Sequence, residues 1–464
     1  MSIEPPLTVG LISLGCAKNL VDTQIMSGVL LTEGLTLAHD ANHADIVLIN
    51  TCAFIEAARE EASAIIDEMS AHKAGGGCRA VIVTGCLPQR YRGALAARFP
   101  QVDAWLGVDE LESIAHVARE AAARPPDAPP VVLVSSQPKA LFAPRIPQLA
   151  FSHPASAYLK IAEGCNHACA FCAIPGIRGR FRSRPVDALV AEARALLKDG
   201  RRELNLVAQD STGYGRDRRG APRLAGLLRA LDALPGRFWI RILYGYPAAV
   251  GDDLLAAMAG ARHVLPYLDI PIQHSHPDIL RAMRRADTVR VLPGLVPRLR
   301  AALPGVVLRT TCLVGFPGET EAHFEHLAAF VAQTRFDHLG VFAFSPEAGT
   351  PARELPDPVP AEVAAARRDR LMRVQQGVVE QNNRARIGTT TEALLLHPDP
   401  TRRGGWLARA DWQAPDVDGE TRLEGLPASA KTGDLVKIRI VGAEGYDFTG
   451  VPARRPRGAI GSGA

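Results

Sequence analysis

The chain has 464 residues, more than one hydrophobic core usually organises, so we expect two to four domains. Its 47% apolar and 22% charged residues are ordinary for a globular protein, and a net charge of +4 permits a nucleic-acid partner without requiring one. The sequence shows neither a secretory signal nor an apolar run near the roughly 18 residues of a membrane helix, so we expect a cytoplasmic protein with no membrane partner.

The N-terminal segment alternates short apolar runs with helical patterns. Buried strands are expected at residues 9–14, 46–49 and 80–83, and helices at residues 19–33 and 56–72. Strands and helices in alternation predict a parallel, doubly wound sheet. We therefore expect an α/β domain over residues 1–123.

A proline-rich linker is expected at residues 124–150, with room for one edge strand. Beyond it, strand-length and helix-length patterns alternate again from residue 151 to residue 386. The expected strands are residues 158–162, 203–208, 239–244, 267–272, 306–314 and 338–344, each followed by room for a helix, such as 185–198. Six such units predict an open (β/α)6 barrel, whose catalytic groups lie at the C-terminal ends of its strands.

The last segment loses the helical periodicity. Short strands at residues 391–396, 406–410 and 435–441, separated by glycine and aspartate, predict a small β-barrel over residues 387–453. Residues 454–464 are rich in glycine, proline and arginine, and we expect them to be disordered.

Three of the eight cysteines lie in one loop directly after the first barrel strand. Cys165, Cys169 and Cys172 have the spacing C-x3-C-x2-C, which lets one loop wrap three thiolates around a four-iron cubane and leaves one iron open to a small molecule. The alternative is a structural zinc site with His167 as the fourth ligand. The position at the C-terminal end of a barrel strand favours the cluster.

This loop, with Phe171 before its last cysteine, resembles the radical S-adenosylmethionine superfamily. The resemblance implies that the open iron binds the amino and carboxylate groups of S-adenosylmethionine, and that one electron from the cluster cleaves it to a 5′-deoxyadenosyl radical. It also implies that Phe171 lies near the adenine, although packing within the loop is an equally good interpretation.

A second set of cysteines is dispersed along the N-terminal segment. Cys16, Cys52 and Cys86 each follow a predicted strand by two or three residues. Because the loops after parallel strands converge on one crevice, these thiols should meet without any local motif. Gly15 and Gly85 would let the backbone approach an inorganic cluster closely.

The other polar candidates each have an ordinary structural alternative. Arginines alternate at residues 178, 180, 182 and 184, where one or two could bind a cofactor carboxylate or an acidic substrate. The alternative is that the set forms a solvated basic strand edge. We assign Phe171, Arg182 and Gln209 as candidate contacts to the cofactor, and no catalytic acid or base stands out. The weaker candidates are Asp210, the loop 315–320, and His274 and His276 of a turn, together with Trp406, Tyr446 and Phe448, which could stack on bases but are more often core.

Two cysteines fall outside both sets. Cys78 precedes its strand and should lie at the opposite edge of the sheet, so we interpret it as structural or solvent-facing. Cys312 lies inside a predicted barrel strand and is expected in the core, with a position facing the inside of the barrel as the alternative.

The whole pattern resembles the methylthiotransferase family, whose members have a cysteine-bearing N-terminal domain, a radical barrel and a small C-terminal barrel called TRAM. The resemblance implies two 4Fe-4S clusters, one held by the three-cysteine loop and an auxiliary one held by Cys16, Cys52 and Cys86. It further implies that S-adenosylmethionine is used twice, once to methylate sulfur at the auxiliary cluster and once to generate the radical that removes hydrogen from the substrate.

Two branches of that family act on different substrates, an adenosine of transfer RNA or an aspartate of ribosomal protein S12. Residues 387–464 carry ten Lys+Arg and ten Asp+Glu, whereas an RNA-binding surface normally has an excess of basic residues. Residues 410–424 carry five acidic groups against one arginine, which should repel phosphate and attract a basic ribosomal protein. Four segments resemble the RimO branch in sequence, and this branch modifies the β-carbon of the aspartate. They are residues 12–22, 83–91, 177–185 and 414–419.

We therefore expect ribosomal protein S12 as the substrate, an electron donor such as flavodoxin or ferredoxin, and no specific nucleic acid. The alternatives are the transfer-RNA branch and, in another class, a non-enzymatic zinc-bound RNA-binding protein. A zinc-bound protein of this kind would be colourless and would not cleave S-adenosylmethionine. A radical methylase that adds no sulfur is a third alternative, and the second cysteine set argues against it.

Overall fold

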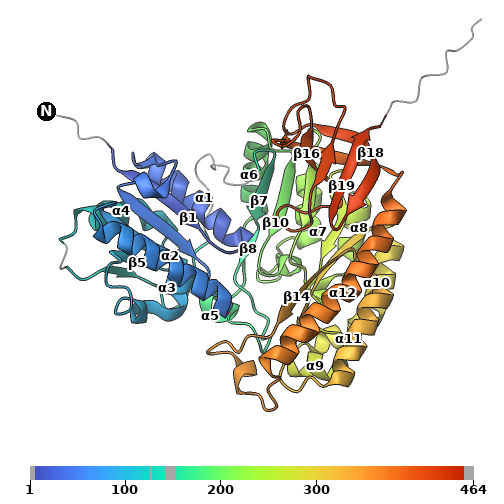
Figure 1. Cartoon of the computed structure of the whole chain (residues 1–464), viewed down its shortest axis with the longest axis horizontal. Helices are drawn as coiled ribbons and strands as arrows, with labels where there is room; N and C mark the ends of the chain where they lie inside the picture. Colours follow the sequence, from blue (N-terminus) through green and yellow to red (C-terminus); the bar gives the residue numbers. More distant parts are fainter. Residues whose placement is uncertain (1–5, 126–127, 142–152, 454–464) are drawn as a thin grey trace, which may run out of the picture.

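The computed structural model describes residues 6–125, 128–141 and 153–453. It has an N-terminal α/β domain, a central open barrel and a small C-terminal barrel, which Figure 1 shows in blue, green to orange, and red. The expected disordered tail, residues 454–464, and part of the expected linker lie outside the described residues. Across the described ranges, no helix is long and apolar enough to cross a membrane.

The N-terminal domain contains a six-stranded parallel sheet in the order β2-β1-β3-β4-β5-β6. Its strands are β1 (Thr8–Ser13), β2 (Thr36–Leu37), β3 (Ile46–Thr51), β4 (Ala80–Gly85), β5 (Ala104–Leu106) and β6 (Val131–Leu133). Helices α1 (Ala17–Thr32) and α4 (Ile114–Ala123) cover one face, while α2 (Glu56–Ala74) and α3 (Cys86–Tyr91) cover the other. The doubly wound prediction is confirmed, and β6 is the edge strand for which the linker had room.

The central domain contains a second six-stranded parallel sheet, in the order β14-β13-β12-β11-β10-β7, which stays open. The strands are β7 (Ser156–Lys160), β10 (Glu203–Val207), β11 (Trp239–Ile242), β12 (Val264–Asp269), β13 (Val307–Val314) and β14 (His338–Ala343). The helices that follow them are α6 (Val186–Lys198), α7 (Leu224–Asp232), α8 (Asp252–Ala259), α9 (Pro277–Ala282), α10 (Ala286–Ala302) and α11 (Glu321–Thr334). The open (β/α)6 barrel is confirmed, although β12 begins and ends three residues earlier than expected. Beyond its end, Gln273 still forms a parallel bridge with Cys312 of β13.

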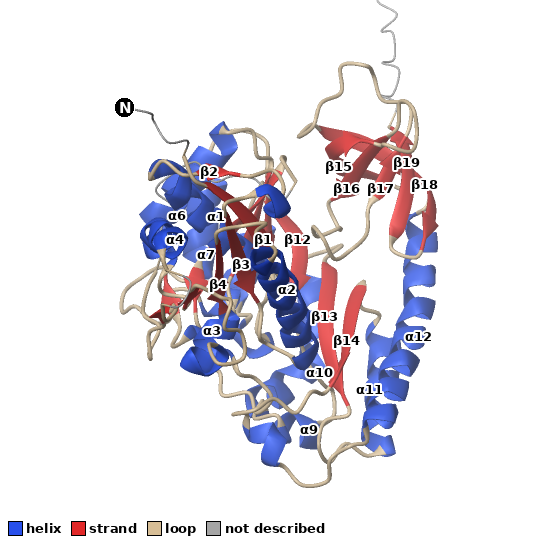
Figure 2. Cartoon of the chain, turned by 60° about the vertical axis from the view of Figure 1, so that its left-hand side comes forward, coloured by secondary structure: helices blue, strands red, loops and turns tan. Residues whose placement is uncertain are grey.

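Two short elements connect the cysteine loop to the barrel. Strands β8 (Ala162–Glu163) and β9 (Arg182–Ser183) pair with each other, and α5 (Ile174–Arg178) lies between them in the sequence. Helix α12 (Ala361–Arg386), which no single sequence signal predicted, runs beside β14 and leads into the C-terminal barrel (Figure 2).

The C-terminal barrel is closed in the order β15-β16-β17-β19-β18. Its strands are β15 (Thr390–Pro398), β16 (Trp406–Ala410), β17 (Thr421–Leu423), β18 (Leu435–Glu444) and β19 (Asp447–Pro452). The predicted β-barrel is confirmed, whereas β17 and β19 were not predicted. Three residues, as in β17, are too few to show an alternating pattern.

The inside of the open barrel is filled by its two neighbours. One continuous apolar cluster includes α1, the inward-facing side chains of β7 to β13 and the interior of the C-terminal barrel. Arg409 of the C-terminal barrel forms an ion pair with Glu203 at the start of β10, and both side chains are buried. The C-terminal barrel therefore closes the N-terminal end of the open barrel, and α1 lies against β7 further along.

This closure uses part of the acidic loop at residues 410–424. Asp418 is completely buried, where it accepts hydrogen bonds from Tyr267 and the guanidinium of Arg309. Asp416 accepts a hydrogen bond from the Tyr158 hydroxyl at 2.8 Å. Both carboxylates help to dock the C-terminal barrel on the strands. Asp416 and Glu424 of the same loop are nevertheless exposed, so the attraction of a basic partner stays a prediction.

Candidate active site

All six cysteines singled out from the sequence line one cavity of about 440 Å³. The cavity lies where the C-terminal ends of the strands of both parallel sheets face each other. Walls from the barrel side include Gln209 after β10, Tyr244 after β11 and Gln273 after β12. Two separately folded sheets therefore contribute their loops to one site, as the rule for parallel sheets predicts for each alone.

The three N-terminal cysteines occupy equivalent positions at the ends of neighbouring strands. Cys16 is the residue before α1, Cys52 directly follows β3, and Cys86 is the first residue of α3, directly after β4. Strand β3 pairs in parallel with β1 on one side and with β4 on the other. The C-terminal ends of the three strands therefore lie side by side. The predicted convergence of the three cysteines is confirmed, because all three line the same cavity.

The glycines beside these cysteines allow neighbouring segments to pack closely, while their expected role beside a cluster stays a prediction. Gly15 has φ +91°, and a Cβ there would lie 2.6 Å from the Cβ of Cys52 and 3.2 Å from its sulfur. A Cβ at Gly85, with φ +96°, would lie 2.7 Å from the carbonyl oxygen of Thr51. The glycines thus let adjacent cysteine loops pack against each other, which is what brings the thiols together.

The barrel cysteines lie between β8 and α5. The amide of His167 donates to the sulfur of Cys165 at 3.4 Å, and the guanidinium of Arg285 lies 3.9 Å from the sulfur of Cys169. Burial raises the pKa of Cys165 to about 11 and that of Cys172 to about 12. Because a metal ligand must be a thiolate, these thiols need the positive charge of a bound metal to lose their protons.

The auxiliary set has a more basic environment. Burial raises the pKa of Cys86 to about 12, although the nearby guanidinium of Arg178 opposes the rise. Burial also raises the pKa of Cys16, but Lys18, Arg178 and the amides at the start of α1 outweigh burial, and the net shift is downward. Cations aimed at a sulfur set are suited to a cluster whose thiolates and sulfides carry negative charge.

A single zinc ion does not suit either cysteine set as it stands. Tetrahedral zinc, with Zn–S bonds of about 2.3 Å, requires sulfurs about 3.8 Å apart. Within the described part of the chain, the group whose ligand atoms all lie within 4.8 Å of one another is His276, Asp278 and His323, which includes no cysteine. Wider spacing is what three corners of a cubane require, so the donor sets fit an iron–sulfur cluster better than zinc.

His167, the proposed fourth zinc ligand, has other partners. Its Nε2 lies 2.8 Å from a carboxylate oxygen of Asp210, and its ring stacks on Tyr246 with centroids 3.8 Å apart. It therefore forms part of the wall of the cavity.

Of the predicted cofactor contacts, Phe171 and Gln209 line the cavity and Arg182 does not. The Gln209 amide donates to Glu163 at 2.7 Å, while its oxygen is buried without a partner. Such an orphaned acceptor at a cavity wall indicates a polar ligand. Arg182 donates to the carbonyl of Arg180 at 2.6 Å and that of Ala140 at 3.2 Å, so its role as a cofactor contact stays a prediction.

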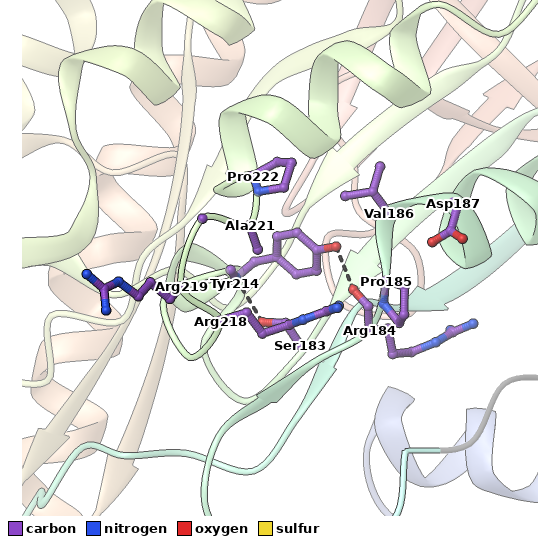
Figure 3. Close-up of a pocket in the computed structure, with 12 residues that line it drawn as sticks. Ser183, Arg184, Pro185, Val186, Asp187, Tyr214, Arg218, Arg219, Ala221 and Pro222 are labelled. Carbon is purple, nitrogen blue, oxygen red and sulfur yellow. Dashed lines mark hydrogen bonds between the residues drawn. The ribbon is translucent and has the colours of Figure 1, made fainter.

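The neighbouring arginines differ from Arg182. Arg178 is buried and lines the cavity, whereas Arg184 lines a second cavity of about 310 Å³ away from the cysteines. Figure 3 shows this second cavity, in which the Tyr214 hydroxyl donates to the carbonyl of Arg184 and the Gly215 amide donates to Ser183. The alternating pattern could not distinguish the one arginine of the four that reaches the cysteines.

Of the weaker candidates, Asp210 lines the cavity, whereas the others have structural positions. His274 is fully buried, 3.7 Å from Glu319, and outside the cavity lining. Cys312 faces the layer of helices in the core, as expected, and Cys78 is half-buried before β4. The remaining aromatic residues of the C-terminal barrel, Trp406, Tyr446 and Phe448, pack inside the molecule or against its neighbours.

Sequence reasoning missed several residues of the cavity wall. Lys18 and Tyr244 are among them, and so are Gln273 and Arg285. Tyr244 and Gln273 have left-handed backbones, with φ +60° and +70°, a conformation that non-glycine residues adopt at functional sites more often than elsewhere. Lys18 lies inside the segment 12–22 that the sequence already singled out. No motif marks the other three, and only their places after barrel strands could have indicated them.

Comparison with known sequences is consistent with this architecture. The uncharacterized protein family UPF0004 matches residues 8–107, the radical SAM superfamily matches residues 159–331, and the TRAM domain matches residues 387–452. Among solved structures, the radical S-adenosylmethionine methyltransferase TsrM from Kitasatospora setae, with tryptophan substrate and a cofactor analog bound, has a TM-score of 0.54 over 72% of each chain. At 15% identity this likeness shows the fold alone.

Curated relatives are much more similar. The ribosomal protein uS12 methylthiotransferase RimO of Syntrophus aciditrophicus (strain SB) is 45% identical, over 95% of this chain and 97% of that protein. The protein of the same name from Anaeromyxobacter sp. (strain K) is also 45% identical, over 96% of this chain and 93% of its own. Because identity at this level extends over nearly the full length of both partners, the chain belongs to the RimO family of ribosomal protein uS12 methylthiotransferases, within the radical SAM superfamily.

Proposed function

We propose that this protein is a radical S-adenosylmethionine methylthiotransferase that adds a methylthio group to the β-carbon of an aspartate of ribosomal protein uS12. The observation that carries the proposal is the meeting of two cysteine triads, one from each parallel sheet, on a single cavity of about 440 Å³. A reaction that needs a radical generator and a sulfur donor requires both next to the same substrate atom.

Each triad has a distinct assignment. Cys165, Cys169 and Cys172 hold the 4Fe-4S cluster that binds S-adenosylmethionine, and the second triad, Cys16, Cys52 and Cys86, holds the auxiliary 4Fe-4S cluster. When bound, these groups supply one-electron cleavage of the sulfonium and the methylthio group, chemistry that no side chain provides. Three protein ligands at each cluster leave one corner for a small molecule.

The residues of the chain orient the cofactor and enclose the reaction. Gln209 offers its buried, unpaired oxygen to a donor such as the amino group of S-adenosylmethionine. Phe171 provides an apolar face beside the cysteine loop, where it also packs against the buried Phe316 cluster. Tyr244 and Tyr246 extend the wall between the triads, and such a lining excludes water from a reactive radical.

The mouth of the cavity is suited to a protein substrate. Two aromatic residues of the lining are exposed, Phe54 by 37% and Phe342 by 52%, one from each domain. Exposed aromatic side chains beside a cavity favour a partner that packs on them while one of its side chains enters. The transfer-RNA alternative needs a basic excess that residues 387–464 do not have.

The reaction also requires electrons from outside the chain. We infer a small electron-transfer protein such as flavodoxin or ferredoxin as the donor, because the cluster that the cysteine loop would hold needs one electron for each cleavage. Since the substrate is a ribosomal protein, we place the reaction in the cytoplasm.

Mass spectrometry tests the proposal directly. Anaerobically reconstituted enzyme is incubated with recombinant uS12, S-adenosylmethionine, sulfide and a reductant, and with unmodified transfer RNA in parallel. The expected result is a gain by uS12 of one methylthio group in place of one hydrogen, located on an aspartate, with no change in the transfer RNA. Modified transfer RNA and unchanged uS12 would overturn the proposal.

A further inference from the structure

Lys18 carries a positive charge into the cavity between the two cysteine triads. It lies in the first turn of α1, two residues after Cys16, and its side chain lines the cavity although only 9% of the residue is exposed. The ammonium lies over the ring of Tyr244, 3.3 Å from the ring centroid. Among the residues that the structure describes, no carboxylate lies within 4.0 Å of it.

A buried ammonium without a carboxylate is unusual in this molecule. Lys160 is also buried, but it forms ion pairs with both Asp22 and Glu163. Arg178, on the same side of the cavity, is paired with the same two carboxylates. Buried charges are normally paired, because desolvation is costly, so the unpaired charge of Lys18 is available to an anionic ligand.

The aromatic platform under Lys18 is held in place by the barrel. Tyr244 has a left-handed backbone, its amide donates to a carboxylate oxygen of Asp269 at 3.1 Å, and its carbonyl accepts from the Ser211 amide at 2.9 Å. These two backbone hydrogen bonds and the left-handed conformation fix the position of the Tyr244 ring. It attracts the ammonium through its π face without neutralising it, which leaves the donor hydrogens free for a ligand.

We propose that Lys18 binds the side-chain carboxylate of the substrate aspartate, an inference that rests on the proposed function. In aspartate the β-carbon is bonded directly to the carboxylate carbon. A cation that holds this carboxylate between the triads therefore also fixes the carbon from which hydrogen is removed and to which sulfur is added. Lys18 thus distinguishes aspartate from a neutral side chain of the same shape, such as asparagine.

The experiment measures binding and not only turnover. Affinities of reconstituted wild-type, Lys18→Met and Lys18→Arg enzymes are measured for recombinant uS12 and for uS12 with the modified aspartate changed to asparagine. The wild type should bind the aspartate form about 10- to 100-fold more tightly, the usual strength of a charge-assisted hydrogen bond. Lys18→Met should bind both forms equally, at the wild-type level for asparagine, and Lys18→Arg should keep part of the preference.

Three controls make the result specific. Lys431→Met removes an equal charge from an exposed side chain of the C-terminal barrel and should keep the full preference. Iron content should be unchanged in every variant, and a loss of iron from Lys18→Met would assign Lys18 to the auxiliary cluster and overturn the inference. The affinity for S-adenosylmethionine should also be unchanged in Lys18→Met, and a loss there would assign Lys18 to the cofactor and overturn the inference.

The two claims fail in different ways. If the wild type does not modify uS12, the proposed function is wrong. If the wild type modifies uS12 but binds its aspartate and asparagine forms equally, or if Lys18→Met keeps the preference, the proposed function stands and the role of Lys18 is wrong. The wild-type comparison needs no variant, so the test holds even if Lys18→Met does not fold.

Discussion

The guanidinium of Arg178, at the end of α5 in the barrel, lies 3.4 Å from the sulfur of Cys86 in the N-terminal domain. The same side chain donates to Asn19 and Asp22 of α1 and to Glu163 of the barrel. One buried arginine therefore ties the cysteine loop of the barrel to the other triad. The network holds the two halves of the cavity together, because the cation and its partners come from both domains.

Replacing Arg178 by methionine should destabilise the protein. The change leaves Asp22 and Glu163 buried with less positive charge, and removing one partner of a buried ion pair costs about 3 kcal/mol of unfolding free energy. Denaturant unfolding of the apoprotein measures this cost. Arg281→Met, which removes an exposed pair with Asp278, should cost less than about 1 kcal/mol, and equal losses would contradict the account.

Gly15→Ala should selectively impair the auxiliary triad. The new Cβ would lie 2.6 Å from that of Cys52, so the two cysteine loops must move apart. Gly34 also has a left-handed backbone, but a Cβ there meets no atom within 4 Å, so Gly34→Ala is a control for backbone strain alone. Iron analysis should show a loss approaching one cluster in Gly15→Ala and no loss in Gly34→Ala. The packing role of Gly15 is wrong if both variants keep their iron.

The docking of the C-terminal barrel should depend on pH through Glu203. Burial alone would raise the pKa of this carboxyl, but Arg409 and Arg241 outweigh burial and hold the pKa at about 2, below its ordinary value of 4.5. A carboxyl with a lowered pKa in the folded state stabilises the fold above about pH 4.5 and loses that contribution as the pH falls toward 2. The contribution is at most about 3 kcal/mol.

Unfolding of the apoprotein between pH 6 and about pH 2 tests this dependence. The Glu203→Gln variant should be less stable than the wild type at pH 6 and should lose less stability on acidification. If the free energy of unfolding falls as steeply with pH in Glu203→Gln as in the wild type, other carboxyls control the acid response.

Removing the auxiliary triad should separate the two halves of the chemistry. The variant with Cys16, Cys52 and Cys86 changed to alanine should lose about half the iron while it still cleaves S-adenosylmethionine, because the other triad lies in a separate loop. It should not modify uS12. Loss of cofactor cleavage together with the iron would mean that the triads do not act as independent sites.

The sequence was sufficient for those features that depend on one sheet at a time. The positions of Cys16, Cys52 and Cys86 follow from parallel strands whose loops converge, and Cys165 to Cys172 form a local motif. The meeting of the two triads on one cavity could not be predicted, because it depends on how α1 packs against β7, and no periodic pattern encodes that packing.

Charge counts do not show which partner each charge has. The acidic loop at residues 410–424 indicated a surface for a basic protein, yet Asp418 is buried against Tyr267 and Arg309. Composition gives the number of charges on a segment but not the partners that neutralise them. For the same reason the alternating arginines could not be ranked, and Lys18 was missed although it lies in the segment 12–22.

The central claim is that the two triads hold two clusters around one cavity, and electron paramagnetic resonance of the reduced, reconstituted enzyme tests it most directly. Spectra are recorded for the wild type and for the two variants that each lack one triad. The account predicts a wild-type spectrum broadened by coupling between neighbouring spins, so that it differs from the sum of the two variant spectra. A wild-type spectrum equal to that sum, or iron sufficient for one cluster only, would contradict it.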